Sequence, residues 1–86
     1  MNTIKIRIEG QLRNQTNYVW NNARLIYIDL LSNIYLTIEL RSKIKTLQKE
    51  LLLLDDAWTY SGIPDKNKTE RILNNLRYLL HLISSD

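Results

Sequence analysis

The chain has 86 residues, a net charge of +3 and no cysteine, so it has room for one domain and cannot contain disulfides or thiolate-based metal sites. Hydrophobic residues make up 44% of the chain and charged residues 24%, with two glycines and one proline, which excludes a disordered or low-complexity chain. Because a chain of this length buries only about 60% of its unfolded surface when it folds alone, and Leu and Ile account for 27 of its residues, we expect an oligomer or an obligate partner.

The first predicted element is a β-strand over residues 3–9. Apolar and polar residues alternate there and place Ile4, Ile6 and Ile8 on one face, a period of two that is typical of a strand. Gly10 ends the pattern. A single strand leaves its backbone donors and its apolar face without partners. We therefore expect it to pair with the same strand of a second chain across a two-fold axis.

The next stretch, from Gln11 to Ser61, contains no glycine or proline, which favours helices over tight hairpins. A spacing of three and four residues defines a seam along it, in which ten of twelve positions are apolar. The seam positions are Val19, Ala23, Ile26, Leu30, Asn33, Thr37, Leu40, Ile44, Leu47, Leu51, Leu54 and Trp58. The seam predicts one long helix or two shorter ones. Strands remain an alternative to helices for residues 23–41, because residues 34–41 also alternate between apolar and polar side chains.

The C-terminal part of the chain predicts a helical hairpin. Gly62 and Pro64 are typical of a helix end, and Asn67 with Glu70 predicts a capping box for a helix over residues 68–83. We expect that helix to fold back antiparallel onto the seam. The predicted architecture is therefore mainly α, with a strand that pairs across a dimer in residues 1–41 and a helical hairpin in residues 42–86.

The N-terminal order of strand, short helix, break and helix has a counterpart in a known family. Residues 6–9 (Ile-Arg-Ile-Glu), 12–15 (Leu-Arg-Asn-Gln) and 25–30 carry the likeness. On these residues the chain resembles the ribbon-helix-helix proteins, in particular the DNA-binding end of RelB/DinJ-type antitoxins. The resemblance covers about residues 3–41.

The resemblance implies a dimer that binds double-stranded DNA. A two-stranded ribbon fits the major groove, and the side chains on its outer face would be Thr3, Lys5 and Arg7. Residues 1–24 carry four basic residues and one acidic residue, a balance that favours an anionic partner. The predicted function is a sequence-specific DNA-binding protein, an antitoxin-like repressor of its own operon.

The helical hairpin is expected to serve assembly or partner binding. Likeness to antitoxins implies a partner such as a toxin, and packing into a dimer or tetramer is the other interpretation. The candidate residues are Leu47, Leu51, Leu54, Trp58, Leu76 and Leu80. A second function stays open: a small helical protein-interaction module, such as an immunity protein, inhibitor or chaperone, without DNA binding.

No residue pattern in the sequence predicts catalysis, a cofactor or a metal site. His81 is the only histidine, two glycines form no phosphate-binding loop, and no zinc-ligand spacing occurs. The longest unbroken apolar run is Leu51 to Leu54, so no membrane span is expected. We expect a cytoplasmic protein that is not an enzyme.

Overall fold

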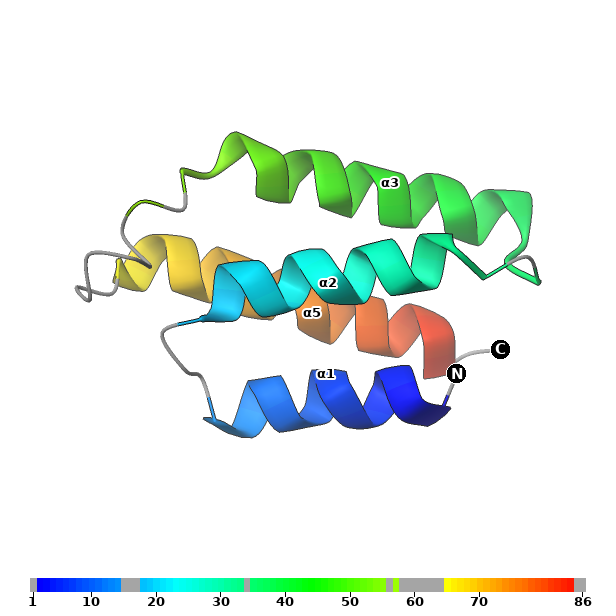
Figure 1. Cartoon of the computed structure of the whole chain (residues 1–86), viewed down its shortest axis with the longest axis horizontal. Coiled ribbons are helices and arrows are strands. Elements are labelled where there is room, and N and C mark those ends of the chain that lie inside the picture. The colour runs from blue at the N-terminus through cyan, green and yellow to red at the C-terminus, as the bar shows by residue number, and fades with distance from the viewer. Residues whose placement is uncertain (1, 15–17, 34, 56, 58–64, 85–86) are drawn as a thin grey trace.

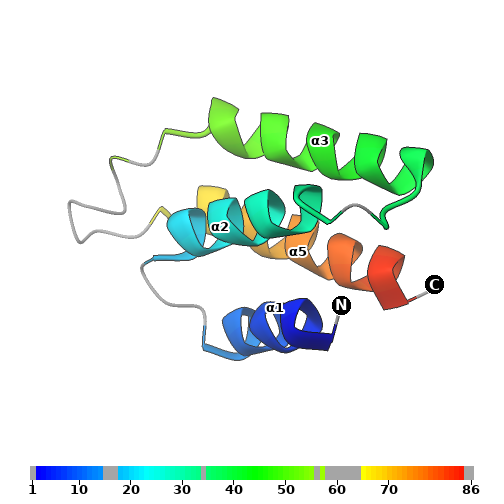
Figure 2. The same ribbon diagram turned by 45° about the vertical axis from the view of Figure 1, so that its right-hand side comes forward.

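The computed structural model describes residues 2–14, 18–33, 35–55, 57 and 65–84. In these ranges the chain forms four helices: α1 (Asn2–Asn14), α2 (Val19–Leu31), α3 (Ile38–Leu53) and α5 (Lys66–Ser84). Successive helices of the described residues run antiparallel, so the four helices pass along the bundle in alternating directions (Figure 1 and Figure 2). The prediction of a mainly α protein is confirmed.

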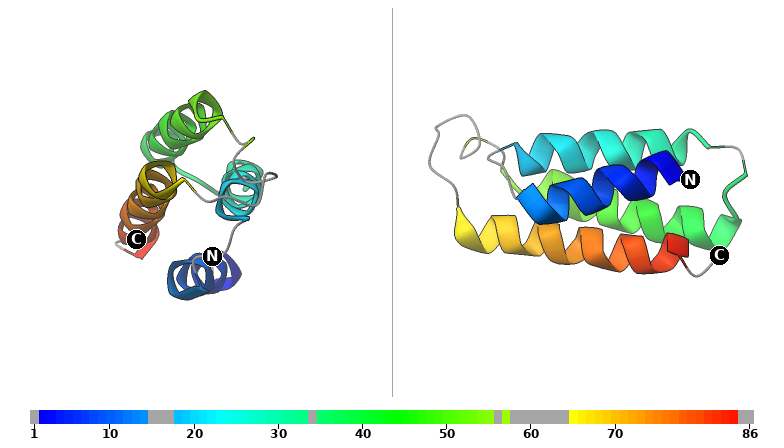
Figure 3. Two further views of the ribbon diagram at one scale, coloured as in Figure 1. Left: turned by 90° about the vertical axis from the view of Figure 1, so that its left-hand side faces the viewer. Right: turned by 90° about the horizontal axis from the view of Figure 1, so that it is seen from below.

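The four helices are not equivalent in the bundle. Both α2 and α5 contact each of the other three helices. The end-on view places α1 and α3 at opposite edges of the bundle, with α2 and α5 between them (Figure 3). Because α3 packs only its inner side on α2 and α5, its outer side faces away from the protein.

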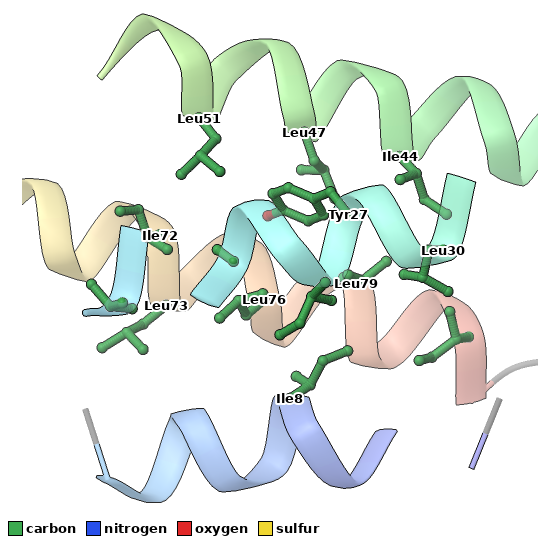
Figure 4. Close-up of a cluster of buried hydrophobic side chains, with 14 of the residues drawn as sticks. Ile8, Tyr27, Leu30, Ile44, Leu47, Leu51, Ile72, Leu73, Leu76 and Leu79 are labelled. Carbon is green, nitrogen blue, oxygen red and sulfur yellow. The ribbon is translucent and has the colours of Figure 1, made fainter. Parts of the chain in front are cut away.

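One apolar core joins all four helices. Its buried side chains come from every helix, and Figure 4 labels some of them: Ile8, Tyr27, Leu30, Ile44, Leu47, Leu51, Ile72, Leu73, Leu76 and Leu79. In α3 the buried residues recur every three or four positions, and in α5 the adjacent Ile72 and Leu73 begin a stripe that continues at the same spacing, as a helix with one buried face requires. The boundary expected at residue 41 falls inside α3, and the core draws residues from both sides of it.

The predicted N-terminal strand is wrong, because residues 3–9 lie within α1. Gly10 does not end the element and instead lies inside the helix. Isoleucines four residues apart share a helix face, so Ile8 is buried and Ile4 packs against the core, while Ile6 is 66% exposed. The packing of that stripe on α2 and α5 outweighs the modest preference of β-branched residues for strands. With no strand among the described residues, the strand-paired dimer is lost as well.

The seam predicted through residues 19–58 is divided between two helices. The break falls at its two polar positions, Asn33 and Thr37. The Asn33 side chain accepts a hydrogen bond from the Tyr35 N–H at 2.9 Å, and Thr37 caps α3 by accepting one from the Leu40 N–H at 3.1 Å. Because Ser, Thr and Asn side chains bond to nearby backbone, they favour turns and helix caps. The alternative of a strand within residues 34–41 is wrong, since α3 begins at Ile38.

The last helix begins earlier than its predicted start at residue 68. The Asp65 carboxylate accepts a hydrogen bond from the Lys68 N–H at 3.1 Å, so Asp65 is the N-cap, while Asn67 of the predicted capping box lies inside α5. The predicted helix end at Gly62 and Pro64 lies outside the described residues. Helices α3 and α5 run antiparallel and contact each other. They do not form a separate hairpin, because α2 packs against both of them.

Candidate interaction surface

The three residues predicted to contact DNA lie in α1 but do not all share one face. Alternate residues of a helix are about 200° apart around its axis, so Lys5 points away from Thr3 and Arg7, which lie four residues apart on one face. Thr3 is exposed and Lys5 is half-buried. The Arg7 guanidinium forms an ion pair with Asp29 of α2. The outer face of a ribbon, on which their predicted role depended, is therefore absent.

The residues predicted for partner binding or assembly lie mostly inside the protein. Leu47, Leu51 and Leu76 are buried in the core, and Leu54 and Leu80 pack against it. Trp58 lies outside the described residues. The chain's own helices therefore cover these leucines, and a partner could not reach the three buried ones without unfolding the protein.

On the opposite face of α3 the fold leaves a row of side chains open. We call them the outer stripe: Ile38, Ser42, Lys45, Lys49 and Leu53, all exposed. They recur every three or four residues, opposite the buried stripe of the same helix. The two apolar ends of the outer stripe are nearly free of contacts, with Ile38 89% and Leu53 82% exposed.

Further apolar side chains extend both ends of the outer stripe. Tyr35, in the connection that leads into α3, is 88% exposed, and Leu52 beside Leu53 is 60% exposed. An isolated exposed apolar residue is ordinary on a protein surface, but a group of them marks a site of interaction. Among the described residues, the three most exposed large apolar side chains are Ile38, Tyr35 and Leu53. Because they lie at the two ends of α3, we take α3 as the candidate site.

The charges on α3 leave two lysines uncompensated. The Lys43 ammonium lies 3.4 Å from the Glu39 carboxylate, and Arg71 of α5 lies 3.2 Å from the Glu50 carboxylate. Both acidic residues of the helix are thus engaged. Lys45 and Lys49 have no ion pair in the part of the chain that the structure describes, and they lie one turn apart in the middle of the outer stripe. The centre of the stripe is therefore positively charged.

Hydrogen bonds between α3 and both α2 and the preceding turn hold α3 in place at its two ends. The Arg41 guanidinium donates to the Leu31 carbonyl at 2.7 Å and to the Asn33 carbonyl at 2.8 Å, which satisfies acceptors that the end of α2 leaves open. Near the other end, the Trp20 indole N–H donates to the Leu51 carbonyl at 3.0 Å. The outer stripe is consequently presented on a helix that is fastened to the bundle.

The interior offers no comparable site. Gln11 is buried, and its amide oxygen accepts from the Asn22 amide at 2.7 Å, while its amide nitrogen has no partner. The Thr69 hydroxyl is also buried without a partner. Among the described residues, no cluster of three or more His, Cys, Asp or Glu residues could hold a metal ion. In the same ranges, no helix combines the length and the apolar character that crossing a membrane requires.

No protein-family model matches the chain, and no curated protein or solved structure is significantly similar to it. The functional assignment therefore depends on the surface of the protein itself. The outer stripe was missed in the sequence, although its signal was present. Once Leu40, Ile44, Leu47 and Leu51 are assigned to the buried face, helical spacing places the outer stripe opposite them.

Proposed function

We propose that this protein is a small helical module that binds another protein through the outer stripe of α3. The observation that carries the proposal is the exposure of Ile38 and Leu53 on one face of a helix whose other face is buried. Apolar side chains in water gain free energy when a partner covers them. Interfaces combine such apolar contacts with a polar surround.

The proposal keeps the second of the two functions expected from the sequence. The first, DNA binding by a ribbon-helix-helix dimer, requires a strand from each chain, and residues 3–9 are helical. A binding module needs only a stable scaffold and an open surface. The bundle supplies the scaffold through its shared core, and α3 supplies the surface at one edge.

Site-specific crosslinking tests the proposal. A photoreactive amino acid would replace Ser42, which lies in the outer stripe between Ile38 and Lys45, or Asn74, on the exposed face of α5. In cells that produce the protein, we expect a discrete crosslinked protein from position 42 and none from position 74. Adding Ile38→Ser and Leu53→Ser to the position-42 protein should abolish the crosslink while circular dichroism stays unchanged.

Two results would contradict the proposal. One is a crosslink from position 74 that equals the crosslink from position 42. The other is a position-42 crosslink that survives both serine substitutions, because the apolar ends of the stripe would then play no part in binding.

A further inference from the structure

We infer that the partner of this protein is an acidic amphipathic helix, with carboxylates in its middle and an apolar side chain at each end, which lies along the outer stripe. The inference rests on the proposed function and adds the chemistry of the partner. Each feature of the partner follows from the order of residues along the stripe, which is apolar at Ile38, cationic at Lys45 and Lys49, and apolar at Leu53.

The charge of the stripe determines the charge of the partner. Lys45 and Lys49 are exposed and lie one turn apart, and no carboxylate of the described residues neutralises either of them. An apolar partner that covered the stripe would remove water from two ammonium groups without replacing it, which is unfavourable. Carboxylates opposite the two lysines compensate for that loss and add long-range attraction toward a chain of net charge +3.

The length of the stripe determines the length of the partner. Ile38 and Leu53 are fifteen residues apart in the chain, and a helix rises about 1.5 Å per residue, so the two apolar ends are about 22 Å apart. A second helix that packs along α3 spans this distance in about four turns. Its apolar residues must therefore be about fifteen positions apart on one face, with acidic residues between them.

A second copy of the chain fits this surface poorly. Antiparallel pairing of two stripes would place Ile38 of one copy against Leu53 of the other and gather four lysines in the middle of the interface. Parallel pairing would set each lysine opposite itself. In either case like charges meet with no carboxylate on the stripe to separate them, which is destabilising.

The order of residues also separates this surface from one that binds membranes or nucleic acid. Helices that lie on a membrane have an apolar face and carry lysines on the polar face, whereas here the lysines lie in the same stripe as the apolar residues, between them. Nucleic acid would engage the lysines through phosphates, but it would leave Ile38 and Leu53 in water. Only a partner with both carboxylates and apolar side chains uses the whole stripe.

Fluorescence anisotropy of a labelled synthetic peptide tests the inference on the full chain. The probe is an alanine-based helical peptide with leucines fifteen positions apart and glutamates between them on the same face, and the control peptide has glutamine in place of glutamate. We expect the acidic peptide to bind about tenfold more tightly than the control, and that difference to shrink as salt is added. Equal affinities for the two peptides would overturn the inference.

Matched charge reversals identify the site. Lys45→Glu with Lys49→Glu should weaken binding of the acidic peptide about tenfold. Arg13→Glu with Lys66→Glu changes the net charge equally at exposed positions of α1 and α5 and should have a much smaller effect. Equal losses of affinity for the acidic peptide in the two double variants would show that the attraction is non-specific and would overturn the inference.

Further measurements separate this inference from the proposed function. If Ile38→Ser with Leu53→Ser abolishes the position-42 crosslink but Lys45→Glu with Lys49→Glu does not, the module binds a protein of different chemistry and only the inference fails. A dimer that light scattering detects and that Leu53→Ser breaks would assign the outer stripe to a second copy of the chain and overturn the inference. Tighter binding to phosphatidylserine vesicles or to duplex DNA than to the acidic peptide would also overturn the inference.

Discussion

At the scale of single residues, Gly10 and Tyr27 show how position in the bundle changes the role of a side chain. Gly10 lies inside α1, and a Cβ atom added to it would meet no atom within 4 Å beyond its chain neighbours and the backbone of its own helix. Tyr27 lies at the opposite extreme, with 1% of its surface exposed, and its ring packs in the core beside Leu47 (Figure 4). Substitution of Gly10 can therefore stabilise the protein, and Tyr27 makes the stability of the protein depend on pH.

Replacing Gly10 with alanine should stabilise the protein. Glycine inside a helix is less favourable than alanine by about 0.5–1 kcal/mol, because the unfolded chain gains conformational freedom from it. The added methyl group has open space in the structure, so nothing opposes this gain. We expect the free energy of unfolding in urea to rise by about that amount, and a decrease would show that residue 10 is not inside a helix.

Tyr27 should make stability fall at high pH. Burial raises the pKa of the Tyr27 hydroxyl above its ordinary value, and the negative charge of Glu50 adds to the rise. The unfolded chain loses this proton near pH 10, while the folded chain keeps it, so the contribution is complete below about pH 10 and is lost progressively as the pH rises further. In urea titrations, Tyr27→Phe should show a shallower decline in stability above about pH 10. Identical slopes would place the Tyr27 hydroxyl in contact with water.

At the scale of elements, the turn between α2 and α3 decides where the surface helix begins. Two polar side chains accept hydrogen bonds from the backbone in this region: Asn33 from the N–H of residue 35 within the turn, and Thr37 from the N–H of residue 40 at the start of α3. Arg41 then reaches back to carbonyls at the end of α2. Polar side chains at two positions of the predicted seam, rather than glycine or proline, therefore divide it between two helices.

The Thr37 cap can be tested by substitution. Thr37→Ala should lower the free energy of unfolding by about 1 kcal/mol, because the Leu40 N–H loses its acceptor. Thr37→Ser keeps a hydroxyl in that place and should retain most of the stability. Urea denaturation of both variants measures the difference, and equal losses would mean that the methyl group of Thr37, and not its hydroxyl, stabilises the turn.

At the scale of the whole molecule, one chain provides a core of its own. Its radius of gyration, 12.5 Å, is close to the value of about 12 Å expected for a compact chain of this length. The many Leu and Ile residues predict a second chain that covers part of them, and among the described residues sixteen hydrophobic ones are already buried within this chain. Of the large apolar side chains that lie open among the described residues, the three most exposed are at the two ends of α3, and two of these, Ile38 and Leu53, belong to the outer stripe.

This division between core and surface predicts that two leucines differ strongly in how much their substitution changes stability. Leu76 is fully buried, so Leu76→Ala should lower the free energy of unfolding by about 2–5 kcal/mol. Leu53 is 82% exposed, and Leu53→Ala should change the same quantity by no more than about 0.5 kcal/mol. Urea denaturation distinguishes them, and similar losses at both positions would mean that Leu53 is covered in the free protein.

The sequence by itself determined most of the helices and their buried faces. The stripes through Leu40 and Ile44, and through Ile72 and Leu76, are read from local spacing because each repeats over several turns. The period-two pattern of residues 3–9 is too short to distinguish a strand from a helix, because Ile4 and Ile8 share a face in a helix as well.

Only the tertiary structure decided how that short segment folds and which faces stay open. Helices α2 and α5 provide an apolar surface on which Ile4 and Ile8 pack when residues 3–9 are helical. These residues therefore form part of α1 and not the expected strand. The same arrangement places α3 at an edge of the bundle and leaves its outer stripe uncovered. Local spacing cannot supply this information, because whether a face is covered depends on helices that are distant in the sequence.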